Sequence, residues 1–267
     1  MDFSQIIVLS FIQGFTEFLP ISSSAHLVLV RELLGWDESG SLAFDVALHV
    51  GTLSAILFYF RSRLGGLLCD FFASILKRKM VGDSRLVWAV GLGTVPVGLF
   101  GLCFGDILEQ YARSWHVIAA TSVLFGILLV VADKKAGAKN LSDITISLAL
   151  IIGLAQAVAL IPGVSRSGIT MTAALFLGFS RTSSAEFSFL LSIPVIVLAG
   201  ALEGAKIAKN LSELSFSFSD VALGVLLSFV FSYACVKLFM AIITRLSMLP
   251  FAIYRIALGL FLFLYFG

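Results

Sequence analysis

Charged residues are scarce in this chain: Asp, Glu, Lys and Arg make up 13% of its 267 residues, whereas 59% are hydrophobic. A soluble globular domain carries about 25% charged residues, so this composition excludes that class of protein. The mean hydropathy of +1.05 indicates a polytopic membrane protein instead. The net charge of +2 is small and the sequence has no basic arm, so we expect no nucleic-acid partner.

Cysteine is also scarce. Cys69, Cys103 and Cys235 lie far apart in apolar surroundings, and none belongs to a Cys-x-x-Cys pair. This spacing indicates neither a zinc site nor a disulfide framework, so we expect the thiols to pack as small hydrophobic groups. The N-terminus lacks the basic region and cleavage site of a removable signal peptide, so we expect the first helix to be retained.

Six apolar segments are close to the roughly 20 residues that a helix needs to cross a bilayer. They are residues 44–60, 86–104, 115–132, 187–204, 221–243 and 251–266. Two further apolar regions, residues 6–34 and 145–178, are each interrupted by a break rich in proline and serine. Because their legs are too short to cross comfortably, we predict two re-entrant helical hairpins, whose freed backbone groups must be satisfied by protein or water.

The two halves of the chain have the same order of elements: a hairpin, a loop, a span that begins near an acid, and two more spans. Three spans per half is an odd number, so the second half must be inverted in the membrane. Inverted repeats usually place the binding site at their interface, where both hairpin tips would meet. We therefore predict one all-α membrane domain with six transmembrane helices, two re-entrant hairpins and two inverted-topology repeats. The predicted repeats are residues 1–140 and 141–267.

The distribution of Lys and Arg predicts the orientation, because short cytoplasmic loops carry an excess of both. Most loop Lys and Arg residues lie in the connections at residues 61–85 and 133–140. We therefore expect these connections to be cytoplasmic and both termini to be outside, with the first hairpin entering from outside and the second from inside. Residues 64–76 are predicted to form an amphipathic helix on the cytoplasmic surface.

The first break gathers polar groups that are costly at membrane depth, and function is the default explanation for such groups. Gln13 and Glu17 are four residues apart, so a helix over residues 6–19 places both on one face. The following proline ends that helix, and the serines at positions 22–24 are good N-cap residues for a new one. We expect Glu17, these serines and His26 to converge at this helix N-terminus, which suits a phosphate.

The second break supplies Ser165, Arg166, Ser167 and Thr170. The planar fork of an arginine suits bidentate binding of phosphate oxygens. Together the two breaks contain an acid, a base, several hydroxyl groups, a cation and two helix N-termini. This set of groups is typical of phosphoryl transfer.

The motifs at the two breaks resemble those of the undecaprenyl-diphosphate phosphatase family, also called the bacitracin-resistance proteins. That family carries a Glu/Gln-x-x-x-Glu signature, then a Pro-x-Ser-Ser-x-x-His stretch, and later a Pro-Gly-x-Ser-Arg-Ser-x-x-Thr signature. They correspond here to residues 13–17, 20–26 and 162–170. Residues 186–191 and 250–255 are also similar to the family, so the resemblance covers essentially the whole chain.

The resemblance implies a bacterial inner-membrane enzyme that removes the terminal phosphate of undecaprenyl diphosphate. This reaction would recycle the lipid carrier for cell-wall synthesis and confer bacitracin resistance. The resemblance also implies a divalent cation, Mg²⁺ or Ca²⁺, and favours a site open to the outer face. The family's catalytic and substrate-contacting residues correspond to Glu17, Ser23, Ser24, His26, Ser165 and Arg166.

We predict that Arg166 and the hairpin N–H groups hold the diphosphate, and that Glu17, with Gln13, holds or orients the cation. Gln13 is the uncharged variant of its signature, so it can offer only a carbonyl oxygen. His26 would be the general base, acting on a water molecule or on Ser23 as the nucleophile. The remaining predicted substrate-binding residues are Ser24, Ser165 and Thr170.

Structural explanations compete with these roles. The alternatives left open are that Glu17 is a buried acid satisfied by a helix N-terminus, that Arg166 only clamps Glu17 or a carbonyl group, and that His26 only closes the hairpin by a hydrogen bond. Outside the breaks, Asp45 can be a helix N-terminal charge, and His49, one turn further on, is expected to be its hydrogen-bond partner.

A second functional class also stays open, because inverted repeats and broken helices are common in transporters. The chain could then be a flippase of the polyprenyl phosphate carrier. The acid, base and hydroxyl groups of the first break favour hydrolysis, since transport needs only charge complementarity. The expected partners are undecaprenyl diphosphate and membrane lipid. A homodimer is also possible, because Gly91, Gly93, Gly98 and Gly101 allow close packing of helices between spans or subunits.

Overall fold

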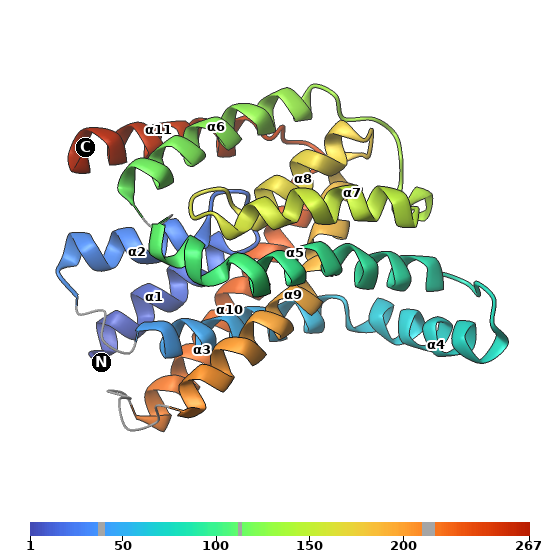
Figure 1. Ribbon diagram of the computed structural model, residues 1–267, viewed down its shortest axis with the longest axis horizontal. Helices are drawn as coiled ribbons and strands as arrows, with labels where there is room; N and C mark the ends of the chain where they lie inside the picture. Colours follow the sequence, from blue (N-terminus) through green and yellow to red (C-terminus); the bar gives the residue numbers. More distant parts are fainter. Residues whose placement is uncertain (37–40, 112–113, 210–216) are drawn as a thin grey trace.

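The computed structural model describes residues 1–36, 41–111, 114–209 and 217–267, and every regular element within them is a helix (Figure 1). The first half contains α1 (Phe3–Thr16), α2 (Ser23–Leu34), α3 (Ser41–Tyr59), α4 (Arg61–Lys77), α5 (Ser84–Tyr111) and α6 (Trp115–Asp133). The second half contains α7 (Ile146–Ala157), α8 (Arg166–Phe176), α9 (Arg181–Lys209), α10 (Phe218–Ile242) and α11 (Leu249–Phe266), with short 3₁₀ turns η1 (Leu141–Asp143) and η2 (Val158–Leu160). The predicted all-α class is confirmed.

Five helices are long and apolar enough to cross a membrane: α5, α6, α9, α10 and α11. They coincide with five of the six predicted spans. The sixth prediction, residues 44–60, falls in α3, which qualifies only together with α4, and the two helices are bent by 81° at their junction. Counting this pair as one span gives six, so the part of the chain that the structure describes is a multi-pass membrane protein with five or six candidate spans.

Both predicted breaks are present. Residues 17–22 separate α1 from α2, and residues 161–165 separate η2 from α8. The four legs have only 14, 12, 12 and 11 residues, which is short for a span. Ser22 and Ser165, the N-cap residues of α2 and α8, have positive φ angles of 73° and 69°, which are uncommon for residues other than glycine. Each serine therefore turns the chain sharply into the second leg of its broken segment.

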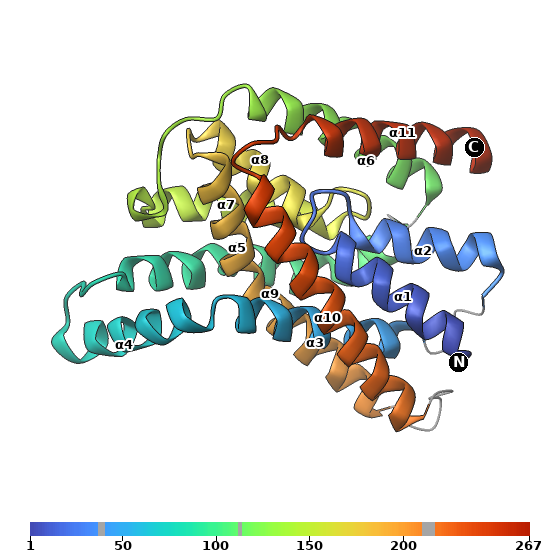
Figure 2. The ribbon, with the colours of Figure 1, turned by 180° about the vertical axis from the view of Figure 1, so that it is seen from behind.

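Each broken segment packs against a long helix from the other half of the sequence. α1 lies along α10, and α7 lies along α5 (Figures 1 and 2). Glycines allow these approaches: a side chain at Gly14 would collide with Phe231 and Ser232 of α10, and one at Gly153 with the backbone of Gly93 in α5. α6 pairs with α11 along one edge of the molecule, and α3 packs on both α9 and α10.

Arg255 of α11 ties the two breaks together and is fully buried. Its Nη1 donates to the carbonyl oxygen of Pro20 at 3.3 Å, and its Nη2 donates to those of Gly163 and Val164, both at 2.8 Å. The hydroxyl of Thr121 in α6 donates to the carbonyl oxygen of Pro162 in the second break at 2.8 Å. These bonds satisfy carbonyl groups that the breaks leave outside regular helices, and they fix one break against the other.

Replacing Arg255 with lysine should lower the stability of the fold. One ammonium group cannot follow a guanidinium to three carbonyls on two segments, and each buried carbonyl left without a donor costs about 1–3 kcal/mol. We expect a clearly lower melting temperature for Arg255→Lys in detergent. Lys237→Ala, at an exposed position in α10, is the control and should leave it unchanged. Equal melting temperatures for both variants would show that the Arg255 hydrogen bonds to the two breaks do not stabilise the fold.

Candidate active site

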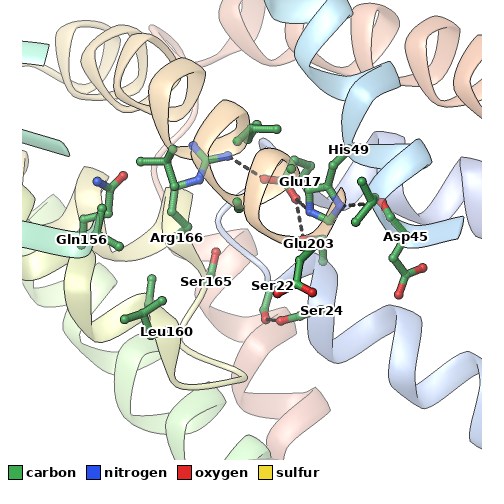
Figure 3. Close-up of a pocket in the computed structure, with 18 residues that line it drawn as sticks. Glu17, Ser22, Ser24, Asp45, His49, Gln156, Leu160, Ser165, Arg166 and Glu203 are labelled. Carbon is green, nitrogen blue, oxygen red and sulfur yellow. Dashed lines mark hydrogen bonds and ion pairs between the residues drawn. The ribbon is translucent and has the colours of Figure 1, made fainter. Parts of the chain in front are cut away.

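A cavity of about 290 Å³ lies where the two breaks meet (Figure 3). Its polar wall is formed by the first break and α2, by α3, by the end of α7 and by the second break. Most of its apolar lining comes from η2, α5 and α9, and α9 also contributes the polar Glu203. The polar lining residues are Glu17, Ser22, Ser23, Ser24, Asp45, His49, Gln156, Ser165, Arg166 and Glu203.

Glu17 is the centre of the polar wall, although it is only 8% exposed. Its Oε1 accepts a hydrogen bond from Nη2 of Arg166 at 2.6 Å. Its Oε2 accepts from Oγ of Ser23 at 2.7 Å and from Nε2 of Gln13 at 3.0 Å. Nε2 of His49 lies 3.6 Å from the same oxygen. The carboxylate thus joins the two breaks, because a cation from the second balances an acid from the first.

The hydroxyl of Ser23 owes its position to the turn before it. Ser22 has a positive φ angle and α2 begins at Ser23, so the first residue of this helix faces back toward Glu17. A serine hydroxyl that donates directly to a carboxylate is the arrangement in which the carboxylate can accept the proton of an attacking oxygen. The site therefore contains a paired hydroxyl and acid at the edge of a cavity.

The second break presents Arg166 at the start of α8. Ser165 caps this helix, because its Oγ accepts from the backbone N–H of Gly168 at 3.1 Å. The guanidinium of Arg166 also donates to the carbonyl oxygen of Ser188 at 3.4 Å, so two contacts hold it at the cavity wall. A mostly buried guanidinium beside a helix N-terminus is suited to an anion.

Three other predicted site residues differ in their access to the cavity. Ser24 lines it and lies 3.3 Å from the hydroxyl of Ser22. Thr170 does not line it: its hydroxyl is buried and bonds to the carbonyl of Arg166 and to the hydroxyl of Ser188. Gln13 is fully buried behind Glu17, and its Oε1 has no hydrogen-bond partner among the described residues.

His26 faces away from the cavity. Its Nδ1 lies 2.7 Å from the carbonyl oxygen of Ser22, and its Nε2 lies 2.6 Å from the hydroxyl of Tyr254 in α11. The two rings are stacked, with centroids 5.5 Å apart. The structure therefore gives His26 the hydrogen bonds of the structural alternative, and it places another histidine beside Glu17.

That other histidine is His49, which the sequence did not identify as a site residue. Asp45 is its hydrogen-bond partner as expected, through the backbone: Nδ1 of His49 lies 2.8 Å from the carbonyl oxygen of Asp45. The carboxylate of Asp45 instead pairs with both terminal nitrogens of Arg31, at 3.0 and 2.5 Å. The His49 side chain is 35% exposed, and it lines the cavity. No sequence spacing relates α3 to Glu17, so only the packing of the helices reveals this contact.

The predicted divalent cation would need several ligands in one place. Within the described ranges, no group of three or more His, Cys, Asp or Glu side chains is placed to hold a metal ion. The donor chemistry near Glu17 still suits Mg²⁺ or Ca²⁺, since both prefer oxygen ligands and Gln13 carries a buried oxygen without a partner in this part of the chain. Such a cation would need further oxygen atoms from a substrate.

The fold and the cavity define a class: a multi-pass helical membrane protein with a cavity, lined by an arginine, acids and hydroxyl groups, where two broken segments meet. The sequence model of a family described as "Bacitracin resistance protein BacA" matches residues 6–261. The chain therefore belongs to this family.

Several curated relatives match along their whole length. The chain is 62% identical to an undecaprenyl-diphosphatase of Campylobacter curvus and 65% identical to one of Campylobacter concisus, with 98% of each chain covered in both comparisons. It is 54% identical to an undecaprenyl-diphosphatase of Teredinibacter turnerae, with 99% of each chain covered.

The pair formed by Glu17 and Arg166 should show strong energetic coupling. Glu17→Gln leaves a buried guanidinium without its anion, and Arg166→Gln leaves a buried carboxylate without its cation, so each should lower the free energy of unfolding by about 3–5 kcal/mol. The double variant should lose about 1–3 kcal/mol less than the sum of the single variants. Titration with a denaturing detergent measures this cycle, and additive losses would show that the two groups are independent.

Proposed function

We propose that the protein is an integral-membrane phosphatase that hydrolyses undecaprenyl diphosphate to undecaprenyl phosphate and inorganic phosphate. It thereby recycles the lipid carrier for cell-wall synthesis and confers bacitracin resistance. The observation that carries the proposal is the chain of contacts from the Ser23 hydroxyl through Glu17 to Arg166 at the cavity wall. Family membership and the printed names of the relatives support the substrate.

Substrate binding begins with an exchange of partners in this proposal. Arg166 is the one lysine or arginine among the described residues that line the cavity. A diphosphate offers several oxygen acceptors to the guanidinium of Arg166. Some of its N–H groups therefore donate to phosphate oxygens in place of the Glu17 carboxylate. Ser24 and Ser165 add hydroxyl groups on either side. Thr170 contributes indirectly, because its hydroxyl bonds the backbone carbonyl of Arg166 and so holds the first turn of α8.

The apolar wall accounts for the other part of the substrate. Val97, Val195 and Ile196 come from α5 and α9 and line the same cavity as the polar residues. An isoprenoid chain can lie against such side chains, because contact with them removes apolar surface from water. The cavity then holds the headgroup at its polar wall, and the chain leaves between long apolar helices.

Hydrolysis proceeds from the contact between Ser23 and Glu17. Oγ of Ser23 attacks the terminal phosphorus, its proton passes to Glu17, and the bond from that phosphorus to the bridging oxygen breaks. Undecaprenyl phosphate leaves, and a water molecule then cleaves the phosphoserine and releases inorganic phosphate. The competing route is direct attack by water, with Glu17 again as the proton acceptor.

His26 stays in the proposal as a second proton acceptor. Its Nε2 is paired with the Tyr254 hydroxyl, so a role as the base on Ser23 requires the imidazole to leave that partner and turn toward the cavity. In the observed position, His26 holds the first turn of α2 through the Ser22 carbonyl and joins it to α11.

The divalent cation, Mg²⁺ or Ca²⁺, also stays a proposal. Glu17 and Gln13 would hold it together with substrate oxygens, and when bound it would neutralise charge that develops on the phosphates. The unpaired oxygen of Gln13 beside the carboxylate of Glu17 supports it.

We further propose that α1–α2 and α7–α8 are re-entrant hairpins of two inverted repeats, residues 1–140 and 141–267. The packing supports this, because each broken segment packs on a helix of the other half: α1 packs on α10, and α7 packs on α5. The matching positive φ angles of Ser22 and Ser165 support it as well. So do the donors from α6 and α11, because Thr121 bonds the carbonyl of Pro162 and Arg255 bonds that of Pro20.

In this topology, the connections rich in Lys and Arg lie in the cytoplasm and the site opens to the outer face of the bacterial inner membrane. A homodimer also remains a proposal. A side chain at Gly93 would contact the carbonyl of Ala149, which accounts for that glycine within one chain. Gly91 and Gly98 have open space beside them, which leaves this face of α5 to lipid or to a second copy.

Phosphate release from undecaprenyl diphosphate by the purified protein tests the function. We expect release that stops with a chelator and returns with Mg²⁺ or Ca²⁺. We expect Arg166→Ala to lower kcat/KM by at least about a hundredfold, because it removes the cation that holds the phosphate. Arg85→Ala, at an exposed position outside the cavity, is the matched control and should retain activity. Lipid binding by wild type without phosphate release would instead favour a flippase, for which the described residues offer no observation of their own.

Ser23→Ala distinguishes the two routes of hydrolysis. If Ser23 is the nucleophile, its removal should lower kcat by about a thousandfold or more, and acid quenching of wild type should trap phosphate on Ser23. If water attacks directly, the loss should be about tenfold and no phosphoserine should form. His26→Ala and Tyr254→Phe complete the set. Loss of activity in the first variant and its retention in the second would support a base role for His26, whereas equal effects would support the structural role.

A further inference from the structure

Gln156 lies at the end of α7 in the wall of the cavity, and its amide group is unusual. Neither Nε2 nor Oε1 has a hydrogen-bond partner in the described part of the chain, and the side chain is fully buried. Buried amides are nearly always hydrogen-bonded, so an amide with both ends unpaired calls for an explanation. Such a group lowers the stability of the fold unless something else pairs with it.

Gln13 in the first half of the chain is a glutamine in a similar position, and its side-chain amide is hydrogen-bonded. It is also fully buried one turn before a break, and its Nε2 donates to Glu17, four residues further along. The residue four positions after Gln156 is Leu160, which cannot accept a hydrogen bond. The second half therefore keeps the glutamine of the Gln-x-x-x-Glu pattern without the acid that pairs with it.

The place of Gln156 indicates what could pair with it. It lines the same cavity as Ser165 and Arg166, and Figure 3 shows Arg166 between Gln156 and Glu17 in that view. Leu160 and Ile196 line the same cavity and have no hydrogen-bonding side chains. A ligand that reaches Arg166 with one oxygen brings further oxygens toward this amide. A phosphate has this geometry, because its oxygens accept hydrogen bonds in several directions.

We propose that Gln156 is a substrate-binding residue whose Nε2 donates to a phosphate oxygen of the lipid diphosphate, beside Arg166. The inference deepens the proposed function and rests on it. The Oε1 atom then accepts from a water molecule or a protonated phosphate oxygen. Glu17 and Gln156 thus have opposite tasks: the acid accepts a proton, and the amide donates to the phosphate without adding charge.

The test uses Gln156→Met, which nearly preserves the size of the side chain and removes both hydrogen-bonding atoms. We expect KM for undecaprenyl diphosphate to rise about tenfold with little change in kcat, because a hydrogen bond to a charged group is lost from substrate binding. We also expect an equal or higher melting temperature, since an unpaired buried amide has been removed. A purely structural glutamine would give a lower melting temperature and an unchanged KM, which would overturn the proposal.

Direct binding separates this proposal from the proposed function. The probe is farnesyl methylenediphosphonate, which cannot be hydrolysed, titrated into detergent-purified wild type, Gln156→Met and Ser232→Ala. Ser232 is the control because its buried hydroxyl is also unpaired among the described residues, but it lies outside the cavity. We expect about tenfold weaker binding for Gln156→Met alone. Equal Kd values in all three proteins, or no binding by wild type, would overturn the role of Gln156. Phosphate release by wild type, measured separately, decides the proposed function.

Discussion

The hydrogen bonds from Arg255 to the carbonyls of both breaks hold the two broken segments against each other. A helix that stops inside an apolar environment leaves backbone groups that water cannot satisfy there. One guanidinium from α11 supplies donors to both stops at once. Because the donors are fixed, the residues immediately after each stop are fixed as well. The position of the site therefore depends on the hydrogen bonds that satisfy the backbone carbonyls at the two breaks.

The electrostatics of the site follow from that arrangement. Glu17 and Arg166 belong to segments that are remote in sequence, and each would be unfavourable if buried alone. They compensate each other at 2.6 Å, and this contact also aligns Ser23 on the remaining carboxylate oxygen. A negatively charged ligand that competes for Arg166 leaves Glu17 with less positive charge nearby, so it becomes a better proton acceptor. In the proposed reaction, binding and activation are thus coupled through one ion pair.

Local signals in the sequence were sufficient for much of the fold. Five long apolar helices and both breaks follow from hydropathy and from proline and serine positions, and the motifs identified Glu17, Ser23 and Arg166. Contacts between elements that are far apart in the sequence could not be predicted from it. The stacking of His26 on Tyr254 depends on how α2 meets α11, and the approach of His49 to Glu17 depends on how α3 lies beside α1. The bend between α3 and α4 follows no proline, but it lies where the predicted span of residues 44–60 ends, just before the predicted amphipathic helix of residues 64–76. The spacing of residues along one helix predicts which of them share a face, but it does not predict which other helix packs against that face.

The packing of α1 on α10 has a consequence for biogenesis. α1 leaves the ribosome first, but the helix that covers it begins about 200 residues later. At a synthesis rate of about 5–20 residues per second, this delay is roughly 10 to 40 s. Gln13 and Glu17 lack their helical cover during that time, and Glu17 also lacks its cation until Arg166 of α8 is made, about 150 residues after it. The nascent N-terminal segment must therefore be held by water, lipid headgroups or the insertion machinery until the second half arrives.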